Sequence, residues 1–451
     1  MNVSTGKKLN GYQVLSIAFG AMIGWSWILL TSVWINKAGV AGAMSAIFIV
    51  GLSILLIAGI YGELASIFPE NGGEHVYTKV ILGSHASFIC SWLLLLGYVS
   101  VVAFEIVVFP IVLSYLFPSI NQILIWNFNG FDIYLGQVAL GVFVGLLLTF
   151  VNTKGIIVSA NLQTFITVVI VLAGLFLIMG ALSYEFKKPL MEIETNMNGA
   201  IGVAIMVPMM FVGFDIVAQT AREIGLAPKK IALLIMTSVI CGIMFYVSII
   251  MAVGIVLGSD SEGLELSTAV AAEKAWASSS AKYILILVGL AGIITTWNGF
   301  LLGASRLINA MAIDKQLPSW FLDIDRESEP QNPRKALWFI FGVTCMAPLF
   351  GQATLIWFIN AGGLGVVVAY IFVTVSFIKY RIKNAGAVRP FKIPYWKLWG
   401  TLSLLSSLLL LFLYFPMSPN GLIWPYEWGI VLIWCSLGFI LFFLKERNEQ
   451  Q

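Results

Sequence analysis

Residues 16–34 read SIAFGAMIGWSWILLTSVW, an apolar stretch long enough to cross a bilayer, which takes about 20 helical residues. Gly20 and Gly24 lie at its centre, although glycine in a helix interior costs about 1 kcal/mol relative to alanine. One explanation is an interrupted helix. The N–H and C=O groups that an interruption leaves unpaired are tolerated within the hydrocarbon only where they line a cavity or a ligand. The other is that small residues let a neighbouring helix pack closely. The stretch alone leaves both explanations open.

Composition places the chain in a membrane. Of its 451 residues, 59% are hydrophobic and 10% are charged, whereas soluble domains carry about 25% charged residues. Apolar runs recur along the whole length, which predicts an all-α polytopic membrane protein forming a single transmembrane domain over residues 1–451. The first run is too long for a signal peptide and lacks a small-residue cleavage pattern, so we expect it to remain as a membrane helix.

Other classes of protein are disfavoured by the residue patterns. No basic block suggests a nucleic acid partner, and no catalytic triad or metal cluster suggests an enzyme or a bound cofactor. The cysteines all fall inside apolar runs, with neither disulfide nor zinc spacing, so we expect reduced packing residues. These cysteines are Cys90, Cys241, Cys345 and Cys435.

Twelve membrane spans are predicted from the apolar runs. Their approximate bounds are 13–35, 41–68, 86–117, 131–151, 158–183, 198–222, 229–258, 282–311, 335–350, 354–380, 395–416 and 424–444. An even number puts both termini on one side of the membrane. With that side inside, the inner segments hold 20 of the 25 Lys and Arg residues, so the positive-inside rule predicts cytoplasmic termini.

A second interrupted helix is predicted over residues 198–222. Pro208 has no N–H, so the bond to the carbonyl of Ala204 cannot form, and Gly213 follows five residues later. Two broken helices, five spans apart and oppositely directed, are typical of an inverted repeat. We expect helices 1–5 (about 13–183) and 6–10 (about 198–380) to form the two halves, with helices 11 and 12 (about 395–444) appended.

Two connecting segments have features of their own. Residues 70–80 follow turn residues and predict a short amphipathic helix on the inner face. The outer loop at 259–281 has a helical middle, and we interpret it as an external lid.

Several short motifs, in order along the chain, carry a family resemblance. Residues 20–26 read GAMIGWS, which resembles the Gly-x-x-Ile-Gly-x-Gly pattern in the first helix of the amino acid–polyamine–organocation transporters. Further matches are YGEL at 61–64 with PENGG at 69–73, FVGFD at 211–215, and the segment from Arg306 to Pro318. The resemblance implies a five-plus-five inverted-repeat fold with discontinuous helices 1 and 6, and secondary active transport of amino acids or related amines.

The binding site that this resemblance implies also follows from helix chemistry. The opened first helix bares N–H groups at the positive end of its outer half, where a substrate carboxylate would bind. The opened sixth helix bares carbonyls at a negative end, where an ammonium group would bind. The first set is Ile23, Gly24, Trp25 and Ser26, and the second is Met209, Met210, Phe211 and Gly213.

Three positions depart from the family pattern. Ser26 stands where the family usually has its last glycine, and Met209 stands where relatives carry an aromatic residue that caps the substrate. Phe211, Trp25 or Trp27 is a candidate substitute for that cap. The fifth helix contains no lysine, although some proton-coupled relatives place one there.

Two carboxyl groups inside the predicted spans need an explanation. Glu105 lies near the middle of the third span, where a charge costs several kcal/mol. It is interpreted as a cavity-facing residue that binds an ammonium group or a proton, the alternative being a neutral carboxyl that bridges helices. Asp215 follows the second interruption, where it would act as a helix N-cap, as a proton-linked gate, or as both.

Other polar residues have candidate roles in ion coupling and gating. Thr295 and Thr296 are adjacent in the eighth span, and such hydroxyls hold sodium in sodium-coupled members of this fold. Ordinary hydroxyl-to-backbone bonding is the stronger interpretation for that pair. Trp297 is a possible neighbour of the site. Glu63 and Arg306 are expected to snorkel or to form inner-gate ion pairs, and His75 is expected at the surface.

The sequence therefore predicts an importer or exchanger of an amino acid in the cytoplasmic membrane, coupled to H⁺ or Na⁺ or working by exchange. A polyamine, an amino alcohol or another organic amine is the alternative substrate, motivated by Glu105. A channel or a transporter-like sensor is the alternative from another class. We expect the small-molecule substrate and membrane lipid as partners, no nucleic acid, and a monomer or homodimer.

Overall fold

The computed structural model describes residues 8–24, 26–154, 156–184, 196–258, 264, 266–322 and 333–448. Its helices are α1 (Gly11–Ile23), α2 (Ser26–Ile67), α3 (Glu74–Leu82), α4 (Ser84–Ser114), α5 (Leu135–Asn152), α6 (Ile156–Ser183), α7 (Met197–Phe211), α8 (Ile216–Gln219), α9 (Pro228–Leu257), α10 (Ser267–Trp276), α11 (Ser279–Ile313), α12 (Arg334–Thr344), α13 (Thr354–Lys383), α14 (Trp396–Leu413) and α15 (Tyr426–Asn448). Strands β1 (Leu124–Phe128) and β2 (Phe131–Tyr134) form a small hairpin.

The chain is an all-α polytopic membrane protein. In the described part of the chain, ten helical segments are long and apolar enough to cross a bilayer. The first of these segments, Gly11–Ile67, covers the predicted spans 13–35 and 41–68. These two spans meet inside α2 at Gly39, whose φ of 70° lies in the left-handed region that favours glycine. The predicted span 335–350 corresponds to the short helix α12 and to the beginning of the 3₁₀ helix Ala347–Ala353.

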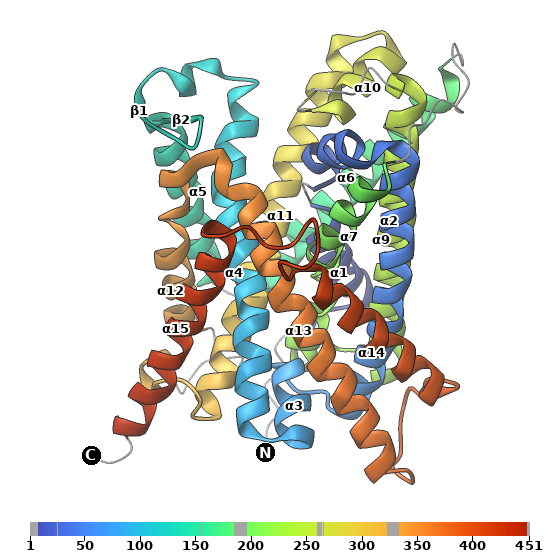
Figure 1. Cartoon of the computed structure of the whole chain (residues 1–451), viewed down its shortest axis with the longest axis vertical. Helices are drawn as coiled ribbons and strands as arrows, with labels where there is room; N and C mark the ends of the chain where they lie inside the picture. Colours follow the sequence, from blue (N-terminus) through green and yellow to red (C-terminus); the bar gives the residue numbers. More distant parts are fainter. Residues whose placement is uncertain are drawn as a thin grey trace.

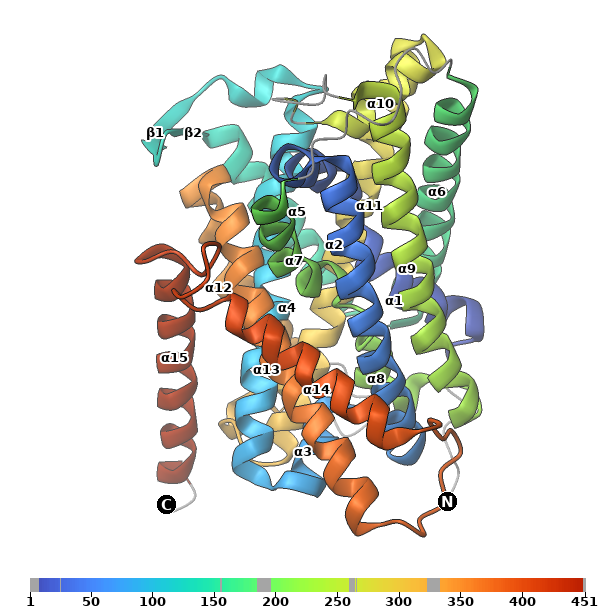
Figure 2. The same cartoon turned by 45° about the vertical axis from the view of Figure 1, so that its right-hand side comes forward.

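The long helices run side by side and form one bundle. Helix α4 packs against α13 and α11, and α2 packs against α7 and α9. Helix α3 and the last turn of α15 lie at one end of the bundle, whereas α10 and the β-hairpin lie at the other (Figure 1). Helix α14 crosses α2 and α13 obliquely, and α15 stands at the edge of the bundle (Figure 2).

Two predicted connecting helices are present, and one element was missed. Helix α3 corresponds to the helix predicted at 70–80, and α10 to the helical middle predicted within 259–281. The missed element is the β1–β2 hairpin, which turns at Asn129 and Gly130, both with positive φ. Asn-Gly between apolar runs is the usual sequence signal of such a turn.

The segment before α1 is joined to the chain that follows α8. Leu9 forms a parallel β-bridge with Ile224. Its N–H donates to the carbonyl of Glu223 at 2.8 Å, and the N–H of Gly225 donates to the Leu9 carbonyl at 2.9 Å. The start of α1 and the segment after α8 are therefore held together by their backbones.

Candidate functional site

The first interruption lies between α1 and α2. Helix α1 ends at Ile23, which is fully buried, and α2 begins at Ser26, with Gly24 in a turn between them. A Cβ atom on Gly24 would lie 1.5 Å from the Thr296 hydroxyl oxygen and 2.6 Å from the Gly292 carbonyl oxygen of α11. An open backbone and close helix packing, the two sequence-based explanations, thus coincide at Gly24. Trp25 lies outside the described residues.

The second interruption lies between α7 and α8. Pro208 is inside α7, so the helix does not break there; it continues to Phe211 and ends at Val212 and Gly213. Gly213 has a φ of +131°, which only glycine adopts readily. A Cβ atom on Gly213 would lie 3.0 Å from the Ala21 side chain and 3.2 Å from the Met22 nitrogen. The two interruptions therefore touch each other.

Tyr246 of α9 connects the two interruptions, and sequence reasoning missed it. Its buried hydroxyl donates to the carbonyl of Met22 and hydrogen-bonds to Ser26 Oγ. The carbonyl oxygen of Met210 lies 3.4 Å from the same hydroxyl. A buried tyrosine hydroxyl needs a partner, and bared carbonyls at a helix interruption provide one. A tyrosine inside an apolar span was the available signal.

A small cavity lies at this junction, enclosed by α1, α2, α4, α7, α11 and α13. Its polar lining comes from Ser26, Ser100 and Thr296, whereas Phe104, Met209 and Phe300 are among the apolar residues that line it. The space open to the centres of water-sized molecules is about 20 Å³, enough for about one water molecule. The surrounding helices must therefore separate for the cavity to hold a solute as large as an amino acid.

The predicted aromatic caps lie away from the cavity. The Phe211 ring packs edge-on against Tyr246, at 5.6 Å between centroids, and contacts Gly51 and Gly242. Trp27 packs edge-on against Phe245. The expectation that either ring covers the cavity is wrong in this conformation, because each is directed toward α9. Phe104 and Phe300 are the aromatic residues that line the cavity instead.

Glu105 is fully buried on α4, next to the cavity-lining residue Phe104. Neither of its carboxyl oxygens has a hydrogen-bond partner among the described residues. The alternative interpretation, a carboxyl hydrogen-bonded between helices, is therefore not seen. Glu105 itself is not among the residues that line the cavity. A buried carboxyl without donors is costly when charged and is normally neutral or paired with a ligand.

Asp215 is fully buried between the interruption and α4. Its Oδ1 accepts from the Gly213 N–H at 2.7 Å, and its Oδ2 accepts from the Tyr98 hydroxyl at 2.6 Å. The predicted N-cap is wrong, because the side chain does not cap α8 and Asp215 has helical φ and ψ. It instead fixes the turn that contains Gly213.

The predicted ion-coupling residues of α11 make different contacts from one another. Thr295 Oγ1 donates to the Gly292 carbonyl at 2.7 Å, an ordinary bond within the helix. The Thr296 hydroxyl lines the cavity beside Gly24 and has no hydrogen-bond partner among the described residues. The Trp297 ring packs against Gly145 of α5. Of these residues, Thr296 alone lines the cavity.

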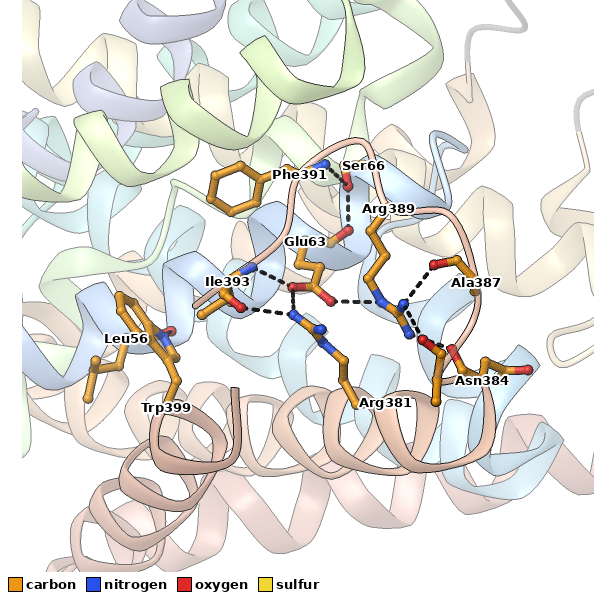
Figure 3. A network of polar contacts seen from close by, with 11 residues as sticks. Leu56, Glu63, Ser66, Arg381, Asn384, Ala387, Arg389, Phe391, Ile393 and Trp399 are labelled. Atoms are coloured by element: carbon orange, nitrogen blue, oxygen red, sulfur yellow. Dashed lines mark hydrogen bonds and ion pairs between the residues drawn. The ribbon is translucent and has the colours of Figure 1, made fainter. Parts of the chain in front are cut away.

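Glu63, near the end of α2, forms a buried ion-pair network with the last turn of α13 and with the chain that follows it. Its Oε2 accepts from Arg381 Nη2 at 2.5 Å and from the Ile393 N–H at 2.8 Å, and Arg389 lies 3.4 Å from its Oε1. Figure 3 shows Glu63 between the two arginines. Of the sequence-based alternatives, ion pairing is confirmed and snorkelling is wrong, because Glu63 is fully buried.

Arg306 and His75 also lie in buried polar contacts. Arg306 Nε pairs with Glu223 Oε1 at 3.1 Å, and both side chains are almost fully buried. The expectation that His75 is a surface residue is wrong, since its ring is fully buried. His75 Nε2 contacts Asp314 Oδ2 at 2.8 Å, and its Nδ1 lies 2.9 Å from Ser87 Oγ and 3.0 Å from Ser91 Oγ. It joins α3 to α4 and to the end of α11.

Two interrupted membrane helices that meet at a buried cavity define a polytopic membrane transporter rather than an enzyme. Residues 13–448 match the amino acid permease family, so the chain belongs to that family and is an amino acid transporter.

Three permeases are similar to the chain over most of its length. The branched-chain amino acid permease BcaP of Bacillus subtilis (strain 168) is 24% identical, over 99% of this chain and 95% of that protein. The amino-acid permease RocC of Bacillus subtilis (strain 168) is 23% identical, over 98% and 96%. The lysine-specific permease LysP of Escherichia coli (strain K12) is 21% identical, over 83% and 78%.

Proposed function

We propose that the protein is a secondary active transporter that moves an amino acid across the cytoplasmic membrane by alternating access. The observation that carries the proposal is the contact between the two interruptions, where Gly213 lies against Ala21 and Met22 beside a buried cavity. Bared peptide groups in a membrane are tolerated where they line such a cavity. The cavity lies between helices that belong to both halves of the proposed repeat.

The polar ends of the interrupted helices match the two charges of an amino acid. Helix α2 begins at Ser26, so its first N–H groups, at the positive end of the helix, are available to a carboxylate. Helix α7 ends at Phe211, so its last carbonyls, those of Met209, Met210 and Phe211 among them, form a negative end for an ammonium group. We propose these backbone groups as the substrate contacts, together with Ile23, Gly24, Trp25 and Gly213.

The proposed topology has twelve spans, with helices 1–5 and 6–10 related as inverted repeats and both termini in the cytoplasm. The distribution of 20 of 25 Lys and Arg residues to one side supports the orientation. The last turn of α15 and helix α3 also lie at the same end of the bundle (Figure 1). The interruptions at Gly24 and Gly213, five proposed spans apart, support the repeat.

The cavity lining favours an amino acid with an apolar side chain. Val101, Phe104, Met209, Phe300 and Ile359 supply apolar contacts, whereas Glu105 does not line the cavity in this conformation. BcaP of Bacillus subtilis, one of the relatives of this chain, is a branched-chain amino acid permease, which agrees with such a substrate.

A second candidate substrate is an amino acid or amine with an additional cationic group. The observation in its favour is the Glu105 carboxyl, which is buried without a hydrogen-bond partner among the described residues, one position beyond Phe104. An ammonium group reaching Glu105 would compensate for the burial of that carboxyl. Uptake of L-lysine and of putrescine by Glu105→Gln distinguishes the candidates. Loss of cation uptake with L-leucine uptake retained supports a cationic substrate, and unchanged uptake of every compound removes Glu105 from the site.

Transport is tested in liposomes that contain the purified protein, with radiolabelled L-leucine and L-lysine as probes. We expect saturable uptake that accelerates when unlabelled amino acid is loaded inside. Comparison with and without a sodium gradient at fixed pH tests sodium coupling, for which Thr295 and Thr296 are the candidate ligands. Flux that never saturates indicates a channel, and binding without flux indicates a sensor; either result overturns the proposal.

A further inference from the structure

Two buried carboxyl groups, those of Glu74 and Asp215, lie next to the interruption between α7 and α8. Glu74 is the first residue of α3, and its Oε2 accepts a hydrogen bond from Gln219 Nε2 of α8. Glu74, Asp215 and Gln219 are all fully buried. The N–H of Gly72 donates to the Gln219 carbonyl at 3.2 Å, and a Cβ atom on Gly73 would lie 3.2 Å from Gln219 Nε2. Helix α3 therefore begins in direct contact with α8.

The ionisable groups around Glu74 do not compensate a negative charge. They are the carboxyl of Asp215, the thiol of Cys90 and four tyrosine hydroxyls, each of which is neutral or negative. The tyrosines are Tyr61 of α2, Tyr77 of α3, Tyr98 of α4 and Tyr370 of α13. The imidazole of His75, the next residue in the chain, hydrogen-bonds to Ser87, Ser91 and Asp314 instead of to Glu74. Two buried carboxyls in such surroundings do not both ionise, so the pair retains a proton.

Hydrogen-bond donors decide which carboxyl holds that proton. Both oxygens of Asp215 accept hydrogen bonds, from Gly213 and Tyr98, which is the pattern of an ionised carboxylate. Glu74 Oε1 has no partner among the described residues, and neither does Gln219 Oε1. Burial, followed by the charge of Asp215, raises the pKa of Glu74. The proton therefore belongs on Glu74.

We propose that Glu74 holds the proton whose movement drives transport, with Asp215 as its ionised neighbour. This inference rests on the proposed transport function. Asp215 fixes the Gly213 turn, and Gly213 contacts Met22 at the cavity, so movement of the turn changes the surroundings of Glu74. When α3 and α8 separate, water reaches the Glu74 carboxyl, whose O–H bond breaks to give a carboxylate and a hydronium ion. Glu74 is thus protonated when α3 and α8 are in contact and ionised when they are separated.

The test uses the purified full chain in liposomes, with radiolabelled L-leucine and L-lysine as probes. Wild type is compared with Glu74→Gln, which keeps the shape but cannot ionise. The matched control is Glu70→Gln, because Glu70 is 56% exposed and pairs with Arg222 only at 3.5 Å. Accumulation driven by an acid exterior and exchange without a gradient are both measured, since exchange requires no net proton movement.

We expect Glu74→Gln to lose at least about tenfold of its gradient-driven accumulation while exchange stays within about threefold of wild type, as a tenfold loss corresponds to about 1.4 kcal/mol. Glu70→Gln should behave as wild type, and Glu74→Asp should recover gradient-driven accumulation. Accumulation by Glu74→Gln that equals wild type overturns the role of Glu74. If Glu74→Gln does not fold, proton entry with the amino acid is measured for wild type and Glu74→Asp. Wild-type exchange without any response to a proton gradient then overturns the inference alone, whereas absence of all transport by wild type overturns the proposed function.

Discussion

The hydroxyl of Tyr246 donates to the carbonyl of Met22 and thereby joins α9 to the end of α1. The same oxygen also meets Ser26 Oγ, at the start of α2. One phenol group therefore holds both edges of the opened backbone in place. A hydrogen bond of this kind contributes about 1 kcal/mol, and a buried group left without its partner costs about 1–3 kcal/mol.

Substitution Tyr246→Phe should therefore lower amino acid uptake by about tenfold, while the protein remains folded, since the ring and its contacts persist. Uptake of L-leucine by liposomes is the measurement, with the thermal midpoint of the purified protein recorded in parallel. Tyr283→Phe is the matched control, because Tyr283 is 50% exposed on α11. Equal uptake by Tyr246→Phe and wild type would show that the hydroxyl does not position the interruption.

Substitution Gly24→Ala should abolish uptake. The added methyl group would lie 2.6 Å from the Gly292 carbonyl, a backbone atom that cannot rotate away, and forced overpacking of this kind costs about 1–3 kcal/mol. Gly342→Ala on α12 is the control, because nothing lies within 4 Å of its added methyl group. Uptake at wild-type level by Gly24→Ala would mean that α2 and α11 are farther apart in the working protein.

Substitution Glu63→Gln should strongly destabilise the protein. It leaves Arg381 and Arg389 buried without their carboxylate, and loss of one member of a buried ion pair costs about 3–5 kcal/mol. The exposed pair of Glu70 with Arg222 is worth less than about 1 kcal/mol, so Glu70→Gln should leave the midpoint unchanged. Thermal unfolding followed by size-exclusion chromatography compares the two variants. Similar midpoints for both would contradict the buried network drawn in Figure 3.

The contribution of Asp314 to stability should depend on pH. Its hydrogen bond from His75, followed by that from Lys79, holds the pKa of Asp314 below its ordinary value. A carboxyl with a lowered native pKa stabilises the folded state above the unfolded value of about 3.9, and that stabilisation is lost as the pH falls through the native pKa. The thermal midpoint of Asp314→Asn should thus lie below that of wild type between about pH 5 and 8, and the difference should shrink below about pH 4. A difference that grows on acidification would contradict this assignment.

The interruptions were predictable because their causes are local. Gly24 is costly in a helix and Gly213 adopts a positive φ, so each residue carries its own signal. Pro208 placed the predicted interruption four residues too early, since α7 continues to its cap at Val212. A helix tolerates the loss of one hydrogen bond when its neighbours stay packed. The Asn129-Gly130 turn carried an equally local signal that was overlooked.

Contacts between distant parts of the chain were not predictable from these patterns. Tyr246 and Met22 are 224 positions apart, and Glu63 and Arg381 are 318 apart. His75 looked like a loop residue because the sequence does not show that Asp314 and two serines enclose it. The orientation of the Phe211 ring toward α9 likewise depends on space provided by Gly51 and Gly242.

The backbone bridge between Leu9 and Ile224 has a consequence for the proposed alternating-access motion. Peptide hydrogen bonds are short and directional, so the two bonded segments cannot slide independently. Helix α1 and the 3₁₀ turn Ala221–Glu223 must therefore move together as one rigid body. A spin label on either one therefore reports the displacement of both.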